Sequence, residues 1–175
     1  MNTKHFGLTI QRLCHQLIER YDDFSGACLV GIQARGVWLS ERLAAELEKL
    51  GVENIQKGKL DITFYRDDFK IRDKPLSAHS TEMDFLVEGK QVVLIDDVLY
   101  TGRTIQAALT ALNHYGRPDN VALLTLVNRR FNRHLPIQPD FVGIAVDALD
   151  EAYVQVQHAE KYDKDQILLF DKKNK

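Results

Sequence analysis

The chain is poor in cysteine, in long apolar runs and in excess charge of either sign. Its 175 residues include two cysteines, Cys14 and Cys28, which excludes a disulfide-stapled scaffold and indicates a reducing compartment. No apolar run approaches ~18 residues and no signal peptide is recognisable, so we expect no membrane span and a cytoplasmic location. The formal net charge of -2 excludes the global basic character by which many nucleic-acid-binding proteins are recognised.

The apolar residues that are present recur at spacings typical of helices and strands. With 45% hydrophobic and 27% charged residues and neither repeats nor a linker, the sequence indicates a single domain over residues 1–175. Helical spacing predicts amphipathic helices over 8–21 and 37–50, the second ending at Gly51. Apolar runs predict strands at 27–32, 91–96, 121–127, 141–145, 153–157 and 167–170, and alternation predicts a half-exposed strand over 60–65.

Strands that alternate with helices indicate an α/β fold, with a mainly parallel central sheet flanked by helices. In such sheets, ligands bind beyond the carboxyl ends of the strands. Three candidate loops follow predicted strands, at 31–36, 97–104 and 128–135. Because these loops share one edge of the sheet, we expect them to contribute to one site.

One continuous run carries most of the functional information. An apolar strand leads into two acids and then into a turn of small and hydroxyl-bearing residues: Val92, Val93, Leu94, Ile95, Asp96, Asp97, Val98, Leu99, Tyr100, Thr101, Gly102, Arg103 and Thr104. Gly102 permits a tight turn, and the N–H groups of the turn and of the following helix start would point at one spot. The run therefore predicts a phosphate cradle beside two carboxylates, which could accept ribose hydroxyls, act as an acid/base pair or bind a metal ion.

This run resembles the 5-phosphoribosyl 1-pyrophosphate (PRPP) signature of type I phosphoribosyltransferases. Residues 98–104 resemble one subgroup, the bifunctional pyrimidine operon regulators and uracil phosphoribosyltransferases, and the resemblance is strongest over 60–68 and 92–104. It implies a type I phosphoribosyltransferase fold with a small hood and a flexible loop, and a homodimer or higher homo-oligomer. It also implies a Mg²⁺-dependent conversion of uracil and PRPP to UMP and pyrophosphate, in which Asp96 and Asp97 hold the ribose.

The same resemblance assigns two further loops. The residues Gln33, Ala34, Arg35 and Gly36 match a turn that binds pyrophosphate and often has an unusual backbone, sometimes with a cis non-proline peptide. The residues Tyr65, Arg66, Asp67 and Asp68 match the start of a mobile catalytic loop, from which Arg66 would reach the leaving pyrophosphate. A loop that closes over the site would keep water from the transition state.

The basic loop at 128–137 matches the nucleobase pocket of this family. The residues that correspond to it are Arg130, Arg133 and Ile137. The sequence departs from the family pattern here, with Asn128 in place of an acid, one extra residue, and Phe131-Asn132 in place of Gly-His. The identity of the base is therefore the least determined part of the prediction.

His15 corresponds to a residue of the RNA-binding surface of the regulators. Gln11 stands where a threonine is usual one turn earlier, and Asp147, Asp150 and Glu151 would repel RNA phosphates. Three alternatives to uracil transfer stay open. They are an RNA-binding attenuation regulator with little catalysis, a transferase for a purine base, and a PRPP-binding protein without chemistry.

Overall fold

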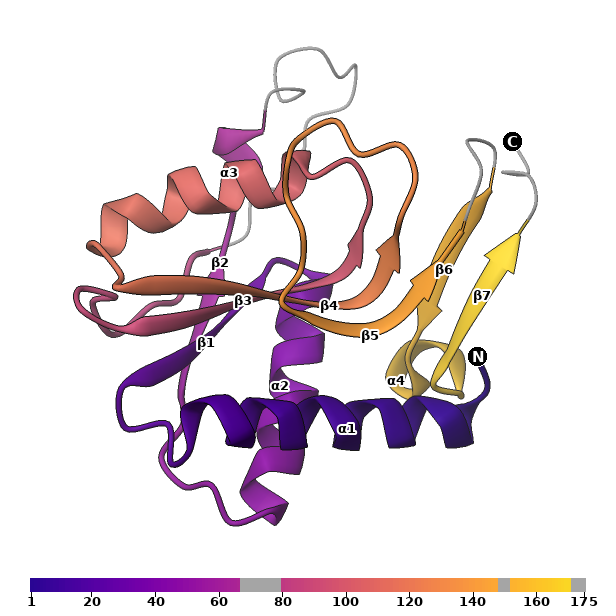
Figure 1. Ribbon diagram of the computed structural model, residues 1–175, viewed down its shortest axis with the longest axis horizontal. Helices are drawn as coiled ribbons and strands as arrows, with labels where there is room; N and C mark the ends of the chain where they lie inside the picture. Colours follow the sequence, from indigo (N-terminus) through magenta and orange to yellow (C-terminus); the bar gives the residue numbers. More distant parts are fainter. Residues whose placement is uncertain (67–79, 148–151, 171–175) are drawn as a thin grey trace.

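The computed structural model describes residues 1–66, 80–147 and 152–170. Its central sheet consists of five parallel strands in the order β2-β1-β3-β4-β5. These strands are β1 (Ala27–Ile32), β2 (Gln56–Leu60), β3 (Gln91–Leu99), β4 (Asn120–Arg129) and β5 (Phe141–Val146). The antiparallel pair β6 (Tyr153–Gln157) and β7 (Gln166–Phe170) stands to one side with the short α4 (Ala159–Tyr162) (Figure 1). The predicted α/β fold with a mainly parallel sheet is confirmed.

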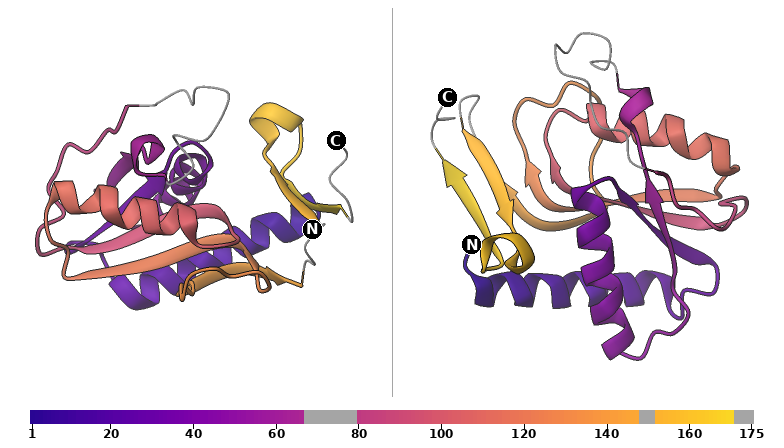
Figure 2. Two further views of the ribbon diagram at one scale, coloured as in Figure 1. Left: turned by 90° about the horizontal axis from the view of Figure 1, so that it is seen from above. Right: turned by 180° about the vertical axis from the view of Figure 1, so that it is seen from behind.

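Helices cover both faces of the central sheet. The helices α1 (Thr3–Tyr21) and α2 (Arg35–Lys49) lie on one face, and α3 (Arg103–Leu112) lies on the other (Figures 1 and 2). Alternate residues of β3 enter two separate cores, Val93 and Ile95 on the α1–α2 side, and Val92 and Leu94 on the α3 side. Burial on both faces explains why this strand reads as a continuous apolar run. No helix within the described ranges has the length and apolar character that a membrane crossing requires.

Most elements lie where the sequence predicts them, with differences at their ends. Helix α1 begins at Thr3, five residues before the predicted start, because the Asn2 side chain caps it by accepting from His5 N at 3.0 Å. Strand β3 continues to Leu99, so that both acids lie inside it, and β4 extends to Arg129. A short 3-10 helix, η2 (Asn113–Tyr115), follows α3.

The predicted strand over 60–65 is wrong. Strand β2 ends at Leu60, and Thr63–Tyr65 form a 3-10 turn, η1. The cause is local, because Asp61 Oδ1 accepts from Thr63 N at 2.9 Å and from Thr63 Oγ1 at 2.6 Å. An aspartate that bonds to the backbone two residues ahead turns the chain instead of letting it extend.

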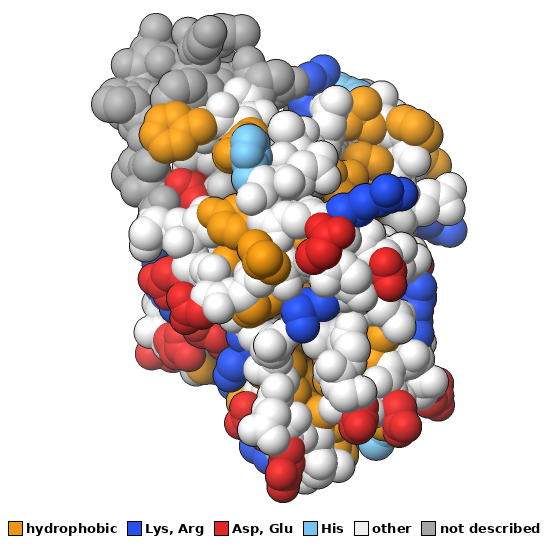
Figure 3. Space-filling model, turned by 90° about the vertical axis from the view of Figure 1, so that its left-hand side faces the viewer, with side chains coloured by type: hydrophobic (Ala, Val, Ile, Leu, Met, Phe, Trp, Pro, Cys, Tyr) orange, Lys and Arg blue, Asp and Glu red, His pale blue; other side chains and the backbone are white. Residues whose placement is uncertain are grey.

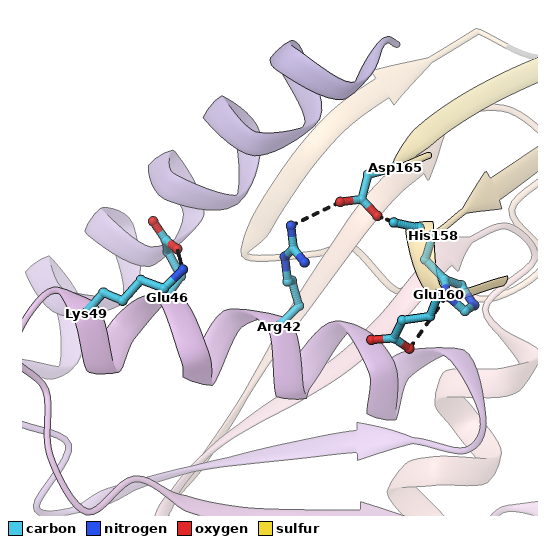
Figure 4. A network of polar contacts seen from close by, with 7 residues as sticks. Arg42, Glu46, Lys49, His158, Glu160 and Asp165 are labelled. Carbon is cyan, nitrogen blue, oxygen red and sulfur yellow. Dashed lines mark hydrogen bonds and ion pairs between the residues drawn. The ribbon is translucent and has the colours of Figure 1, made fainter. Parts of the chain in front are cut away.

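The β6–β7 pair, which we call the hood, is attached to α2. Arg42 of α2 pairs with Asp165 at 3.0 Å, and Asp165 also accepts from Ala159 N at 2.8 Å (Figure 4). The His158 ring stacks on Trp38 of α2 with ring centroids 4.9 Å apart. These contacts fix the hood on the α2 side of the sheet.

Candidate active site

Asp96 and Asp97 lie near the carboxyl end of β3, and both are buried. Since successive residues of a strand point to opposite faces, Asp96 faces the α3 side with Leu94, and Asp97 faces the α2 side. Asp96 Oδ1 accepts from Asp97 N at 2.9 Å. The two carboxylates therefore open onto different loops at the same edge of the sheet.

Burial controls the ionisation of this pair. Burial raises the pKa of Asp96 well above its usual range, and the neighbouring Asp97 charge adds to the effect. Burial also raises the pKa of Asp97, although the charge and hydrogen bond of Arg35 oppose the shift. Arg35 and Arg66 both lower the pKa of Asp96, so two cations reach this carboxylate. The site thus places two buried carboxylates beside two arginine side chains, an arrangement that can accept hydroxyl groups and hold an anion close to them.

The turn at 33–36 approaches the acids from the α2 side. It contains a cis peptide between Gln33 and Ala34, the unusual backbone that the resemblance implied. Gly36 lies directly on β3, where a Cβ atom would collide with the carbonyl oxygen of Ile95. The side chain of Arg35 reaches back to Asp97, with Nη1 3.3 Å from Oδ2.

The loop predicted to bind phosphate, residues 100–104, approaches from the α3 side and is called the phosphate loop below. Gly102 has φ of 93° and precedes the first residue of α3, a conformation that favours glycine. Gly102, the residue before α3, has no side chain that could cap the helix, so the positive helix end faces this loop and could receive an anion. Arg103 N makes a long contact of 3.5 Å with Thr101 Oγ1.

The loop after β4 packs against the phosphate loop. His134 N donates to Thr101 O at 3.0 Å, and Arg133 donates to the Tyr100 carbonyl. The Arg129 guanidinium lies over the Tyr100 ring, 3.8 Å from its centroid. Beside this loop is a cavity of about 390 Å³, lined by Asn128, Arg130, Arg133, Leu135, Pro136, Ile137, Gln138 and Pro139. The predicted nucleobase loop is thus adjacent to the predicted phosphate loop.

The three residues predicted for the base pocket have different surroundings. Ile137 is half-buried and packs near Gly102. Arg130 is exposed and pairs twice with Asp147, at 2.6 Å through Nε and 2.5 Å through Nη2. Arg133 is half-buried and bonded to the protein itself.

Other predicted positions lie at the margin of the site or beyond it. Arg66 follows η1 and is near enough to Asp96 to influence its pKa. Asp67 and Asp68 lie outside the described residues, as do Asp150 and Glu151. His15 is exposed on α1 and does not belong to the three loops at the sheet edge.

Two residues of the site were not singled out from the sequence. Burial lowers the pKa of Arg35, but the charge and hydrogen bond of Asp97 raise it, and Tyr153, at the start of β6, adds a smaller effect in the same direction. No local pattern marks Tyr153, because the hood brings it there. Arg129 ends β4 within the basic loop, and its position over Tyr100 follows from the extension of that strand.

Comparison with known proteins gives a consistent family assignment. Residues 2–161 match the model of the phosphoribosyl transferase domain. The bifunctional protein PyrR of Synechocystis sp. is 47% identical over 148 residues, which cover 85% of this chain and 82% of that protein. The bifunctional protein PyrR of Caldicellulosiruptor bescii is 37% identical over 98% of this chain and 93% of that protein.

Solved structures show the same fold at low identity. The hypoxanthine phosphoribosyltransferase of Trypanosoma cruzi superposes with a TM-score of 0.72 at 13% identity, covering 97% of this chain and 93% of that chain. The purine phosphoribosyltransferase of Pyrococcus horikoshii superposes with a TM-score of 0.62 at 19% identity, covering 84% of this chain and 86% of that chain.

Proposed function

Because the chain belongs to the phosphoribosyl transferase family, and within it to the bifunctional PyrR proteins, we propose that it transfers the phosphoribosyl group of PRPP to uracil. The products are UMP and pyrophosphate. One observation carries this proposal beyond the family assignment. Two buried carboxylates at the end of β3 are flanked on one face by an open phosphate loop and on the other by the Arg35 turn.

This arrangement accommodates the parts of PRPP in a definite order. The 5-phosphate enters the loop at 100–104, the ribose hydroxyls donate to Asp96 and Asp97, and the pyrophosphate meets the turn at 33–36 and Arg66. Catalysis then consists of holding the sugar and stabilising the charge on the departing pyrophosphate. The reaction needs no covalent nucleophile.

The donor set fits a Mg²⁺ ion that arrives with the substrate. Within the described ranges, no three acidic, histidine or cysteine side chains gather as ligands, so a cage made by protein alone is absent there. Mg²⁺ commonly binds to one or two carboxylates together with substrate phosphates. Asp96 and Asp97 are the residues that would face it, and the bound ion would neutralise charge on the pyrophosphate.

The base is the part of the substrate that this chain's own loop must define. The purine transferases among the solved structures share the fold at 13% and 19% identity, which says nothing about the base used here. The deciding experiment supplies PRPP and Mg²⁺ with radiolabelled uracil, hypoxanthine, guanine or adenine in parallel. UMP as the product supports the proposal. A purine nucleotide would contradict the choice of base, and PRPP binding without any product would favour a sensing role.

RNA binding is the second activity that the resemblance implies. The two arginines of α1 are already engaged by the protein itself, since Arg12 donates to the carbonyls of Val142 and Gly143 and Arg20 pairs with Asp140 at 3.1 Å. We therefore place transfer first and RNA regulation second. Binding to pyrimidine leader RNA that weakens steeply with salt, and is lost in His15→Ala, would reverse this order.

A further inference from the structure

Arg133 connects the loop after β4 to the phosphate loop. Its Nη1 donates to the carbonyl oxygen of Tyr100, and its Nη2 donates to Asn128 Oδ1 at 2.6 Å and to the Arg129 carbonyl at 3.3 Å. All three acceptors are neutral. Within the described part of the chain, this half-buried cation has no carboxylate partner.

The two carbonyls of the phosphate loop that face this segment are held by consecutive residues. Arg133 holds the Tyr100 carbonyl, and His134 N holds the Thr101 carbonyl at 3.0 Å. In a trans peptide, the C=O bond and the following N–H bond point to opposite sides. The N–H groups of Thr101 and Gly102 therefore point away from residues 133–134, and neither has an acceptor among the described residues.

The neighbouring Arg130 is paired with a carboxylate, whereas Arg133 is bonded, among the described residues, only to neutral groups. Arg130 lies three residues earlier, and Asp147 neutralises it through two hydrogen bonds. Asn128 gives Arg133 an oxygen of similar shape without the negative charge of an aspartate. The bond therefore orients Arg133 while its positive charge remains available to the phosphate loop.

We propose that Arg133 is a positioning residue for the phosphate loop, which it orients through the Tyr100 carbonyl, and that Asn128 leaves its charge uncompensated. The ligand served in this way is the 5-phosphate of PRPP, so the inference rests on the proposed function. The sequence matches Arg133 to the base pocket, whereas the geometry directs its guanidinium to the loop that would hold the phosphate.

The test measures PRPP binding in the presence of Mg²⁺ and the absence of base, by calorimetry on the full chain. We expect Arg133→Gln to weaken PRPP binding on the order of tenfold, the effect of losing one charged hydrogen bond. The KM for uracil should stay near its wild-type value. Arg133→Lys keeps the charge without the forked geometry of the guanidinium. Its affinity for PRPP should lie between those of the wild type and Arg133→Gln.

Two further variants separate charge from fold. Asn128→Asp keeps an acceptor for Arg133 and cancels its charge, so PRPP binding should weaken severalfold while the thermal midpoint does not fall. Arg117→Gln is the matched control, because this exposed arginine precedes β4 at the opposite end of the sheet, the end that faces the viewer in Figure 3. It should bind PRPP as the wild type does.

Several results would overturn the inference. One is a raised KM for uracil with unchanged PRPP binding in Arg133→Gln, which would assign the residue to the base. Another is wild-type PRPP affinity in Asn128→Asp, which would remove the role of charge even if Arg133→Gln unfolds. Equal losses in Arg117→Gln would show a non-specific charge effect. A wild-type chain that binds no PRPP contradicts the proposed function itself.

Discussion

Arg35 Nη1 lies 3.3 Å from Asp97 Oδ2, which joins the turn expected to bind pyrophosphate to one of the two acids expected to bind ribose. The arginine side chain is 55% exposed and the aspartate 10% exposed. The exposed Arg35 guanidinium can contact an anionic ligand that enters this edge of the sheet. Its charge and hydrogen bond also favour the ionised form of the buried Asp97, so the pair links recognition of an anion to the charge of this acid.

Replacing the two acids tests the ribose assignment. We expect Asp96→Asn and Asp97→Asn each to lower kcat by roughly a hundredfold or more, because hydrogen bonds to the reacting sugar are weakened. The thermal midpoint should not fall, since each variant removes a buried carboxylate whose ionisation is costly. Steady-state kinetics and thermal unfolding of the same preparations check both statements. A folded double variant with wild-type turnover would contradict the assignment.

The raised pKa of Asp96 predicts how stability depends on pH. An acid whose folded pKa exceeds its unfolded value, here 3.8, binds more protons when folded across the interval between them. This group therefore makes the free energy of unfolding largest at acidic pH, and its contribution declines as pH rises from about 4 through the raised pKa. Urea unfolding at a series of pH values measures this slope. Asp96→Asn should flatten it, and identical slopes in the two proteins would show that Asp96 is not the group responsible.

Gly36 and Gly7 form a matched pair for testing close packing. A Cβ atom at Gly36 would collide with the Ile95 carbonyl, whereas one at Gly7 in α1 meets nothing within 4 Å. We expect Gly36→Ala to cost about 2 kcal/mol or more of stability, and to impair turnover, by moving α2 off β3. Gly7→Ala should stabilise the protein by about 0.5–1 kcal/mol, because alanine is the better helix former. Chemical denaturation of both variants measures these changes in stability. An unchanged stability of Gly36→Ala would mean that the backbone around Ile95 can move to accommodate the methyl group.

Arg66 is the cation that we expect to act on the leaving group. Arg66→Gln should lower kcat by roughly a hundredfold, with a smaller change in the KM for uracil, because its charge is needed most as pyrophosphate departs. The pKa of Asp96 should rise further, since Arg66 lowers it in the intact chain. The pH dependence of kcat reports both effects. An unchanged kcat would place Arg66 outside the reaction.

The parts of the fold predicted well from the sequence are those with strong periodicity. The run from Val92 to Ile95 indicates a strand covered on both faces, and helices on both sides of the sheet confirm it. The strand predicted over 60–65 failed because the Asp61 side chain competes with the backbone for Thr63 N. Such a competition depends on one side-chain rotamer, which hydropathy does not record.

In the site, too, features marked by a local sequence pattern were predicted, and contacts between distant residues were not. The two acids and Gly102 belong to one continuous motif, so the sequence places them together. The contacts of Arg133 with Tyr100 and of Tyr153 with Arg35 join residues distant in sequence. Only the β3–β4 pairing and the attachment of the hood bring these residues into reach.

The contact of Gly36 with the Ile95 carbonyl also bears on how this protein can change over evolution. It joins two stretches of main chain, with no side chain between them on the glycine side. The spacing between the Arg35 turn and the strand that carries both acids is therefore set independently of neighbouring surface residues. Substitutions in the loop after β4 that spare Arg133 and His134 can therefore accumulate without moving the Arg35 turn relative to the strand that carries both acids.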